Sequence, residues 1–76
     1  MKDGKIPIHD VYLSAFLDLM GISPTLAFHG SRVVFEFPNT PETGDLLGAY
    51  NRNPSVPLID YVTSLRRLRA QMLANR

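Results

Sequence analysis

The sequence predicts a small α+β domain with the element order α-β-β-α-α, in which helices cover one face of a β-hairpin. Three segments indicate this class: an almost wholly apolar run "VYLSAFLDLM", a pair of β-rich runs in "SPTLAFHGSRVVFEFP", and a helical period in "LIDYVTSLRRLRAQML". The 76 residues are expected to form a single domain over 1–76. Residues 1–9 are expected to be a flexible or extended N-terminal segment.

The first helix is predicted from its two ends and its apolar content. Asp10 is a suitable N-cap, and Gly21 is placed to end the helix in a left-handed conformation. On a helical wheel, Ser14 and Asp18 share one narrow strip, and the other positions are almost all apolar. A helix of this composition is expected to be buried on most sides.

The two β-rich runs flank Gly30-Ser31, which suits a two-residue hairpin turn. This turn fixes the register, with His29 opposite Arg32 and Thr25 opposite Glu36. Opposed residues share a face of the sheet. One face then collects Leu26, Phe28, Val33, Phe35 and Phe37, and the other collects Thr25, Ala27, His29, Arg32, Val34 and Glu36.

Two further helices follow the hairpin. Thr40 is a suitable N-cap and Pro41 a suitable first residue for a short helix that reaches about Asn51. Pro57 opens the last helix, which is expected to run to around Leu73.

A hairpin of two strands spaced about 4.8 Å apart is no wider than one helix of about 10 Å diameter. One hairpin therefore cannot cover two or three apolar helices. We expect a homodimer in which two hairpins form a four-stranded sheet and the first helices meet. The residues expected at this interface are Leu13, Phe16, Leu17, Met20 and Arg69.

Composition excludes several classes of protein. The chain has no cysteine, which rules out disulfides and cysteine-rich zinc sites. It is 45% hydrophobic but has no apolar run near the ~20 residues of a membrane span. The first ten residues do not resemble a signal peptide, so we expect a cytoplasmic protein without membrane association. No metal or cofactor motif is present, and none is expected to bind.

Charge is distributed unevenly along the chain. Residues 61–76 contain four arginines and no acid, whereas residues 1–60 contain four basic and seven acidic groups and sum to −3. Such asymmetry is typical of a nucleic-acid or acidic-partner surface. The basic residues that are candidates for this contact are Arg66, Arg67, His29 and Arg32.

The arginines of "SLRRLRAQ" do not form one basic face on a helical wheel. Arg67 falls opposite the apolar stripe, Arg66 falls on its flank, and Arg69 falls within it. We expect Arg66 and Arg67 to be solvated, and Arg69 to lie over the core or to pair with a carboxylate. The candidate partners of Arg69 are Asp18, Glu36, Asp45 and Asp60.

No catalytic arrangement is apparent. His9 precedes Asp10, but adjacent residues at a helix start point in different directions, and Asp10 is better explained as a cap. His29 and Arg32 beside a tight turn suit a phosphate or an acidic side chain. A small phosphate-binding enzyme would need a cavity near these two residues, and we expect no enzymatic activity.

The ordered pattern resembles a family of short bacterial, archaeal and phage proteins catalogued as a domain of unknown function. The resemblance rests on "YLSAFLDLMG" at 12–21, "RVVFEF" at 32–37 and "VPLIDYVTSLRRLRAQM" at 56–72. The family has an aromatic and leucine-rich first helix, a Phe-x-Phe strand and a Leu-Arg-x-Leu-Arg-like last helix. Where the family places acids after the strand, this chain has Pro38-Asn39. The resemblance implies no activity and no catalytic residues.

These observations favour a non-enzymatic interaction or regulatory module that acts as a homodimer and contacts itself and another protein. The alternative is a nucleic-acid-binding regulator that uses the arginines of its last helix. Binding to duplex DNA that strengthens steeply as salt falls would favour this alternative.

Overall fold

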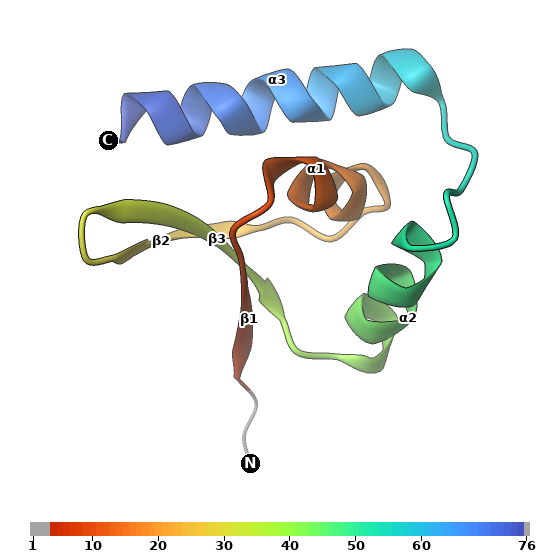
Figure 1. Ribbon diagram of the computed structural model, residues 1–76, viewed down its shortest axis with the longest axis horizontal. Helices are drawn as coiled ribbons and strands as arrows, with labels where there is room; N and C mark the ends of the chain where they lie inside the picture. Colours follow the sequence, from red (N-terminus) through yellow and green to blue (C-terminus); the bar gives the residue numbers. More distant parts are fainter. Residues whose placement is uncertain (1–3, 76) are drawn as a thin grey trace.

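The structure is a computed structural model that describes residues 4–75. This range forms three strands and three helices, arranged as in Figure 1. In chain order these are β1 (Lys5–Ile8), α1 (Val11–Leu19), β2 (Thr25–His29), β3 (Arg32–Pro38), α2 (Pro41–Tyr50) and α3 (Leu58–Ala74). The strands form one antiparallel sheet in the order β1-β3-β2. The predicted α+β class is confirmed.

The hairpin has the predicted register. β2 and β3 pair from His29 opposite Arg32 to Thr25 opposite Glu36. The turn between them has Gly30 at a φ of 69°, a left-handed conformation that glycine adopts without a steric penalty. The alternation of residues along the two strands was therefore sufficient to determine which side chains share a face.

The structure contains a strand, β1, that the predicted order α-β-β-α-α lacks. It lies along the outer edge of β3, with Ile6 opposite Phe37 and Ile8 opposite Phe35. The segment is only four residues long and contains Pro7, which argues against a strand when read in isolation. On an edge strand, however, proline is tolerated where its backbone nitrogen points away from the sheet, because no hydrogen bond of the ladder is then lost. The third strand occupies the edge of β3 that lies away from β2.

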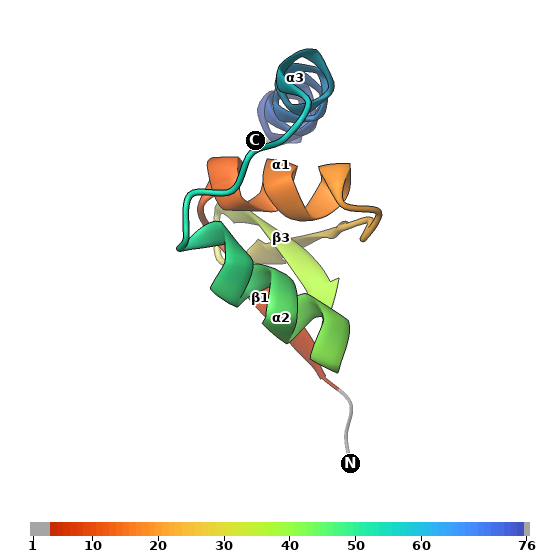
Figure 2. The same ribbon diagram turned by 90° about the vertical axis from the view of Figure 1, so that its right-hand side faces the viewer.

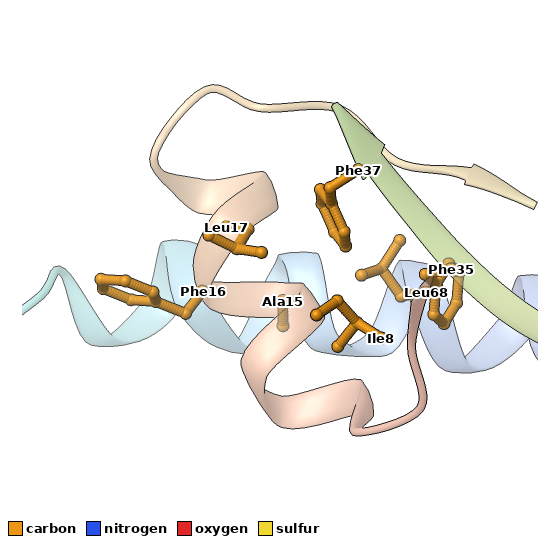
Figure 3. Close-up of a cluster of buried hydrophobic side chains, with 7 residues drawn as sticks. All are labelled: Ile8, Ala15, Phe16, Leu17, Phe35, Phe37 and Leu68. Carbon is orange, nitrogen blue, oxygen red and sulfur yellow. The ribbon is translucent and has the colours of Figure 1, made fainter. Parts of the chain in front are cut away.

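The sheet and two helices form three layers. Figure 2 shows α3 above α1, and α1 above the sheet, with α2 beside them. The core lies between α1 and the sheet and receives one residue from α3 (Figure 3). Its buried members are Ile8, Ala15, Phe16, Leu17, Phe35, Phe37 and Leu68. One chain therefore covers α1 on two sides.

The polar strip of α1 lies beneath α3. Ser14 is fully buried and its hydroxyl donates to the Asp10 carbonyl at 3.0 Å, while the side chain of Asp18 is only 6% exposed. On α3, Ser64 is also buried. Because these polar side chains are either small or paired, α1 and α3 can pack closely. The polar strip of α1 therefore faces α3 rather than water.

The helix starts are those that the sequence predicted. The Asp10 carboxylate accepts hydrogen bonds from the backbone N–H groups of Tyr12 and Leu13, at 2.8 and 3.4 Å. The Thr40 hydroxyl accepts from the N–H of Thr43 at 3.2 Å. Each cap satisfies donors that the helix itself leaves unpaired.

Candidate functional site

A cleft forms because the two packed helices differ in length. α1 has nine residues and α3 has seventeen, which correspond to roughly 13 and 25 Å at 1.5 Å per residue. The C-terminal part of α3 therefore extends beyond α1, above the turn between β2 and β3 (Figure 1). The space between them is an open cleft of about 560 Å³.

The polar wall of this cleft is basic. Arg32 enters from the start of β3 and Arg69 from α3, and the side chains of His9, Tyr12 and Ser31 complete the polar lining. Within residues 4–75, no carboxylate lines the cleft and neither arginine forms an ion pair. Two exposed guanidinium groups thus border one space without a counter-charge from the described chain.

The other part of the lining is apolar. Val11 and Val33 lie at its base, on α1 and β3, while Met72 and Leu73 come from the last turns of α3. Leu73 and the neighbouring Tyr12 are largely exposed. The cleft therefore offers both charge and apolar contact, the combination by which a ligand site fixes orientation and gains affinity.

Arg69 is exposed and lines the cleft. The sequence left two environments open for it: a stem over the core with the guanidinium in water, or a pair with a carboxylate at a helix or subunit interface. Within residues 4–75 it forms no ion pair. The apolar stripe of α3 is longer than the surface that α1 covers, since α1 is the shorter helix. An arginine within the stripe, near the C-terminal end of α3, can therefore line the cleft.

Arg67 is exposed, as expected, but it is also paired with an acid that the sequence did not assign to it. Its guanidinium donates a hydrogen bond to the Asp18 carboxylate and forms an ion pair with it, although the arginine side chain itself is 54% exposed. Asp18 had been considered as a partner for Arg69 instead. A helical wheel places Arg67 opposite the apolar stripe, but it does not show that the Asp18 carboxylate of α1 lies within reach of the guanidinium. Arg66 is exposed, as predicted.

His29 does not line the cleft, although it lies opposite Arg32 on the same face of the hairpin. Its Nε2 atom is 3.4 Å from Glu36 Oε2, and its ring lies 6.2 Å from that of His9 in an edge-to-face arrangement. The register places Val34 between His29 and Glu36 on this face, and Val34 is fully buried. The His29 and Glu36 side chains thus form a polar pair beside Val34, the buried apolar residue on this face of the sheet.

The expected dimer interface on α1 is not available. Phe16 and Leu17 are buried in the core of the single chain, and Leu13 packs against this core. Only Met20 is half-exposed. The width argument behind this interface assumed two strands, whereas β1 widens the sheet and α3 covers the opposite side of α1.

The two edges of the sheet are not equivalent. The β1 edge contains Lys5 and Pro7, a charge and an absent N–H group that both discourage pairing with another strand. The β2 edge contains neither lysine nor proline. Near its end, Phe28 is 59% exposed. Among the described strands, β2 therefore has the less protected edge.

Two tyrosines border a second hollow of about 470 Å³ near the start of α3. The Tyr61 hydroxyl donates to the Tyr12 carbonyl at 2.9 Å. Burial, followed by the proximity of Tyr50 and Asp10, raises the pKa of Tyr61 above its ordinary 10.0. Burial likewise raises the pKa of Tyr50. Both hydroxyls therefore stay protonated at neutral pH. A protonated tyrosine can donate a hydrogen bond, whereas a catalytic base must be deprotonated.

The part of the chain from residue 4 to 75 contains no group of three or more His, Asp or Glu side chains that could hold a metal ion. None of the described helices combines the length and the apolar character needed to cross a bilayer.

Sequence reasoning identified part of the cleft. It singled out Arg32 and Arg69 individually, but assigned Arg69 to an interface. It gave no reason to include Tyr12 or Ser31, and it considered His9 only with Asp10. These residues come together through the packing of α3 over α1, and no local motif marks that packing. The cavity that a phosphate-binding site would require is present beside Arg32, with His9 rather than His29 in its lining.

Comparison with known proteins identifies the family but not an activity. No match is found among the curated proteins or among the solved structures. One family model matches residues 3–74, nearly the whole chain, and its description is "Domain of unknown function (DUF5659)". This agrees with the resemblance seen in the three sequence segments above. The chain belongs to the DUF5659 family.

Proposed function

We propose that the protein is a non-enzymatic interaction module that acts as a homodimer paired through the outer edge of β2. The observation that carries the proposal is this edge, which is unprotected and has a largely exposed Phe28. An unpaired strand edge presents a row of backbone donors and acceptors that a second strand can satisfy. Aromatic side chains, phenylalanine among them, are also enriched at the cores of protein–protein interfaces.

A two-fold axis at Ala27 pairs all five residues of β2 with those of a second copy. In this antiparallel register, Leu26 of each copy lies opposite Phe28 of the other, on the face that α1 covers. Each exposed phenyl ring then packs on a half-buried leucine, and the two three-stranded sheets become one of six strands. The pairing of two hairpins that the sequence suggested for the dimer is retained, with β2 of each copy at the centre of the sheet.

Light scattering coupled to size exclusion should find twice the mass of one chain at micromolar concentration. Phe28→Asp is expected to raise the dimer dissociation constant by more than about tenfold, since a buried aromatic anchor is lost and a charge is buried. Ile59→Asp is the matched control, because Ile59 is 73% exposed on α3 and far from β2 in the chain. A wild-type monomer, or equal shifts in both variants, would contradict the proposal.

Nucleic-acid binding is the second candidate function, and the exposure of Arg66 and Arg69 on α3 supports it. Arg67 is less suited to this role because it is paired with Asp18. A dimer would present two such pairs of arginines at a fixed separation.

A salt titration with generic duplex DNA tests this candidate. Binding should strengthen steeply as salt falls, and the Arg66→Ala/Arg69→Ala variant should lose it, because each phosphate contact releases counterions. The absence of binding at about 50 mM salt would remove nucleic acid as a candidate.

A further inference from the structure

We infer that the cleft between α3 and the hairpin turn binds the phosphate monoester of a nucleotide, with Arg32 and Arg69 on the phosphate and Tyr12 against the base. The nucleotide is either free or at the end of a single strand. Three features of the cleft carry this inference: the charge of its walls, the aromatic side chain at its border and its size.

The charge favours a dianion. Arg32 and Arg69 approach from different elements and no described carboxylate lines the space between them. A phosphate monoester carries about −1.5 to −2 at neutral pH, which matches two guanidinium groups. Arginine also presents donors in a planar fork that fits phosphate oxygens in pairs. The Ser31 hydroxyl, which follows Gly30 in the turn, adds a neutral donor beside Arg32.

The rest of the lining favours an aromatic group attached to that phosphate. Tyr12 is half-exposed, so its ring is accessible from the cleft, and aromatic rings stack on nucleobases without regard to sequence. Met72 and Leu73 provide apolar contacts on the α3 side. A site for inorganic phosphate alone would have no use for this apolar wall.

The size of the cleft favours a single nucleotide over a longer partner. Its volume of about 560 Å³ lies within the range of roughly 300–1,000 Å³ that is usual for small-ligand pockets. An acidic peptide in a helical conformation would need a groove several turns long. In the described chain, the cleft is instead lined by residues from the end of α3, the start of α1 and the hairpin turn.

The test is a titration of the isotope-labelled protein with adenosine monophosphate, followed by amide and arginine Nε resonances. Resonances of Ser31 and Arg69 are expected to shift and to saturate. Adenosine and inorganic phosphate are each expected to bind at least about tenfold more weakly, because each lacks one of the two contacts. The absence of saturation at millimolar nucleotide would overturn the inference.

Substitutions locate the contact. Arg32→Ala and Arg69→Ala are each expected to weaken nucleotide binding by about tenfold or more, and Arg69→Lys by nearly as much, since lysine lacks the planar fork. Arg66→Ala is the matched control and is expected to change the affinity by less than about twofold, because Arg66 is exposed on α3 but does not line the cleft. Equal losses in all the variants would show a diffuse charge effect and refute the site.

Further ligands distinguish the source of the phosphate. A short single-stranded oligonucleotide with a 5′-phosphate should bind more tightly than the same strand with a 5′-hydroxyl. If it also binds more tightly than the mononucleotide, the natural ligand is a strand end; if not, it is a free nucleotide. Tighter binding of an acidic peptide or of duplex DNA at the same resonances would overturn the inference. The Phe28→Asp monomer is expected to retain nucleotide binding, so the dimer and the cleft are tested separately.

Discussion

Removal of residues 1–8 is expected to leave the chain unfolded at 25 °C, although the sequence suggested only a flexible or extended N-terminal segment. The deletion removes β1, whose Ile8 is buried in the core, and it uncovers the edge of Phe35 and Phe37. A domain of 76 residues has a free energy of unfolding of only roughly 4–11 kcal/mol. Loss of one fully buried isoleucine contributes about 1.5–3 kcal/mol of this, and the exposed phenylalanines add to the loss.

A graded version of this prediction keeps the chain folded. Ile8→Ala is expected to lower the free energy of unfolding by roughly 2–5 kcal/mol, through lost burial and the cavity left behind. Lys5→Ala, on the exposed face of the same strand, is expected to change it by no more than about 0.5 kcal/mol. Urea unfolding followed by circular dichroism, at one protein concentration, measures all three proteins. A truncated chain with native stability would show that β1 does not contribute to the fold.

Arg67→Ala is expected to lower the free energy of unfolding by about 1–3 kcal/mol, which is the cost of leaving a buried polar group without its partner. The Asp18 carboxylate, whose side chain is 6% exposed with Arg67 in place, would lose its ion pair. Because Arg67 is half-exposed, water weakens the pair and the loss stays below that of a fully buried one. Arg66→Ala, one residue earlier and solvated, is expected to change stability by less than about 0.5 kcal/mol.

The double variant Asp18→Leu/Arg67→Ala tests the cause of this loss. Replacing both partners removes the buried charge, so much of the stability should return. Urea unfolding of the two single variants and the double variant gives the coupling free energy directly. If Arg66→Ala and Arg67→Ala prove equally mild, the ion pair contributes nothing to the packing of α3 on α1.

The accuracy of the sequence predictions depended on how local each signal was. The hairpin register follows from Gly30-Ser31 and the alternation on either side of it, because side chains in a strand point to alternate faces. The caps at Asp10 and Thr40 likewise involve only the next three residues. By contrast, β1 has no such signal. Its four residues become a strand only because β3 offers them an edge.

The environment of the arginines was the least predictable feature. A helical wheel describes one helix by itself, and it correctly separated Arg66, Arg67 and Arg69 into different directions. It could not show that Asp18 would meet Arg67, or that Arg69 would face Arg32 across a cleft. Both outcomes depend on where α3 crosses α1 and on how far it extends beyond it.

The sequence by itself thus determined the α+β class, the hairpin with its two faces, and the starts of the helices, since each depends on contacts between neighbouring residues. Only the tertiary structure decided that the sheet has three strands, that α1 is covered by its own chain, and that a basic cleft forms at the end of α3. These features depend on contacts between residues far apart in the chain. Their free energy comes from the packing of whole elements, which no local pattern specifies.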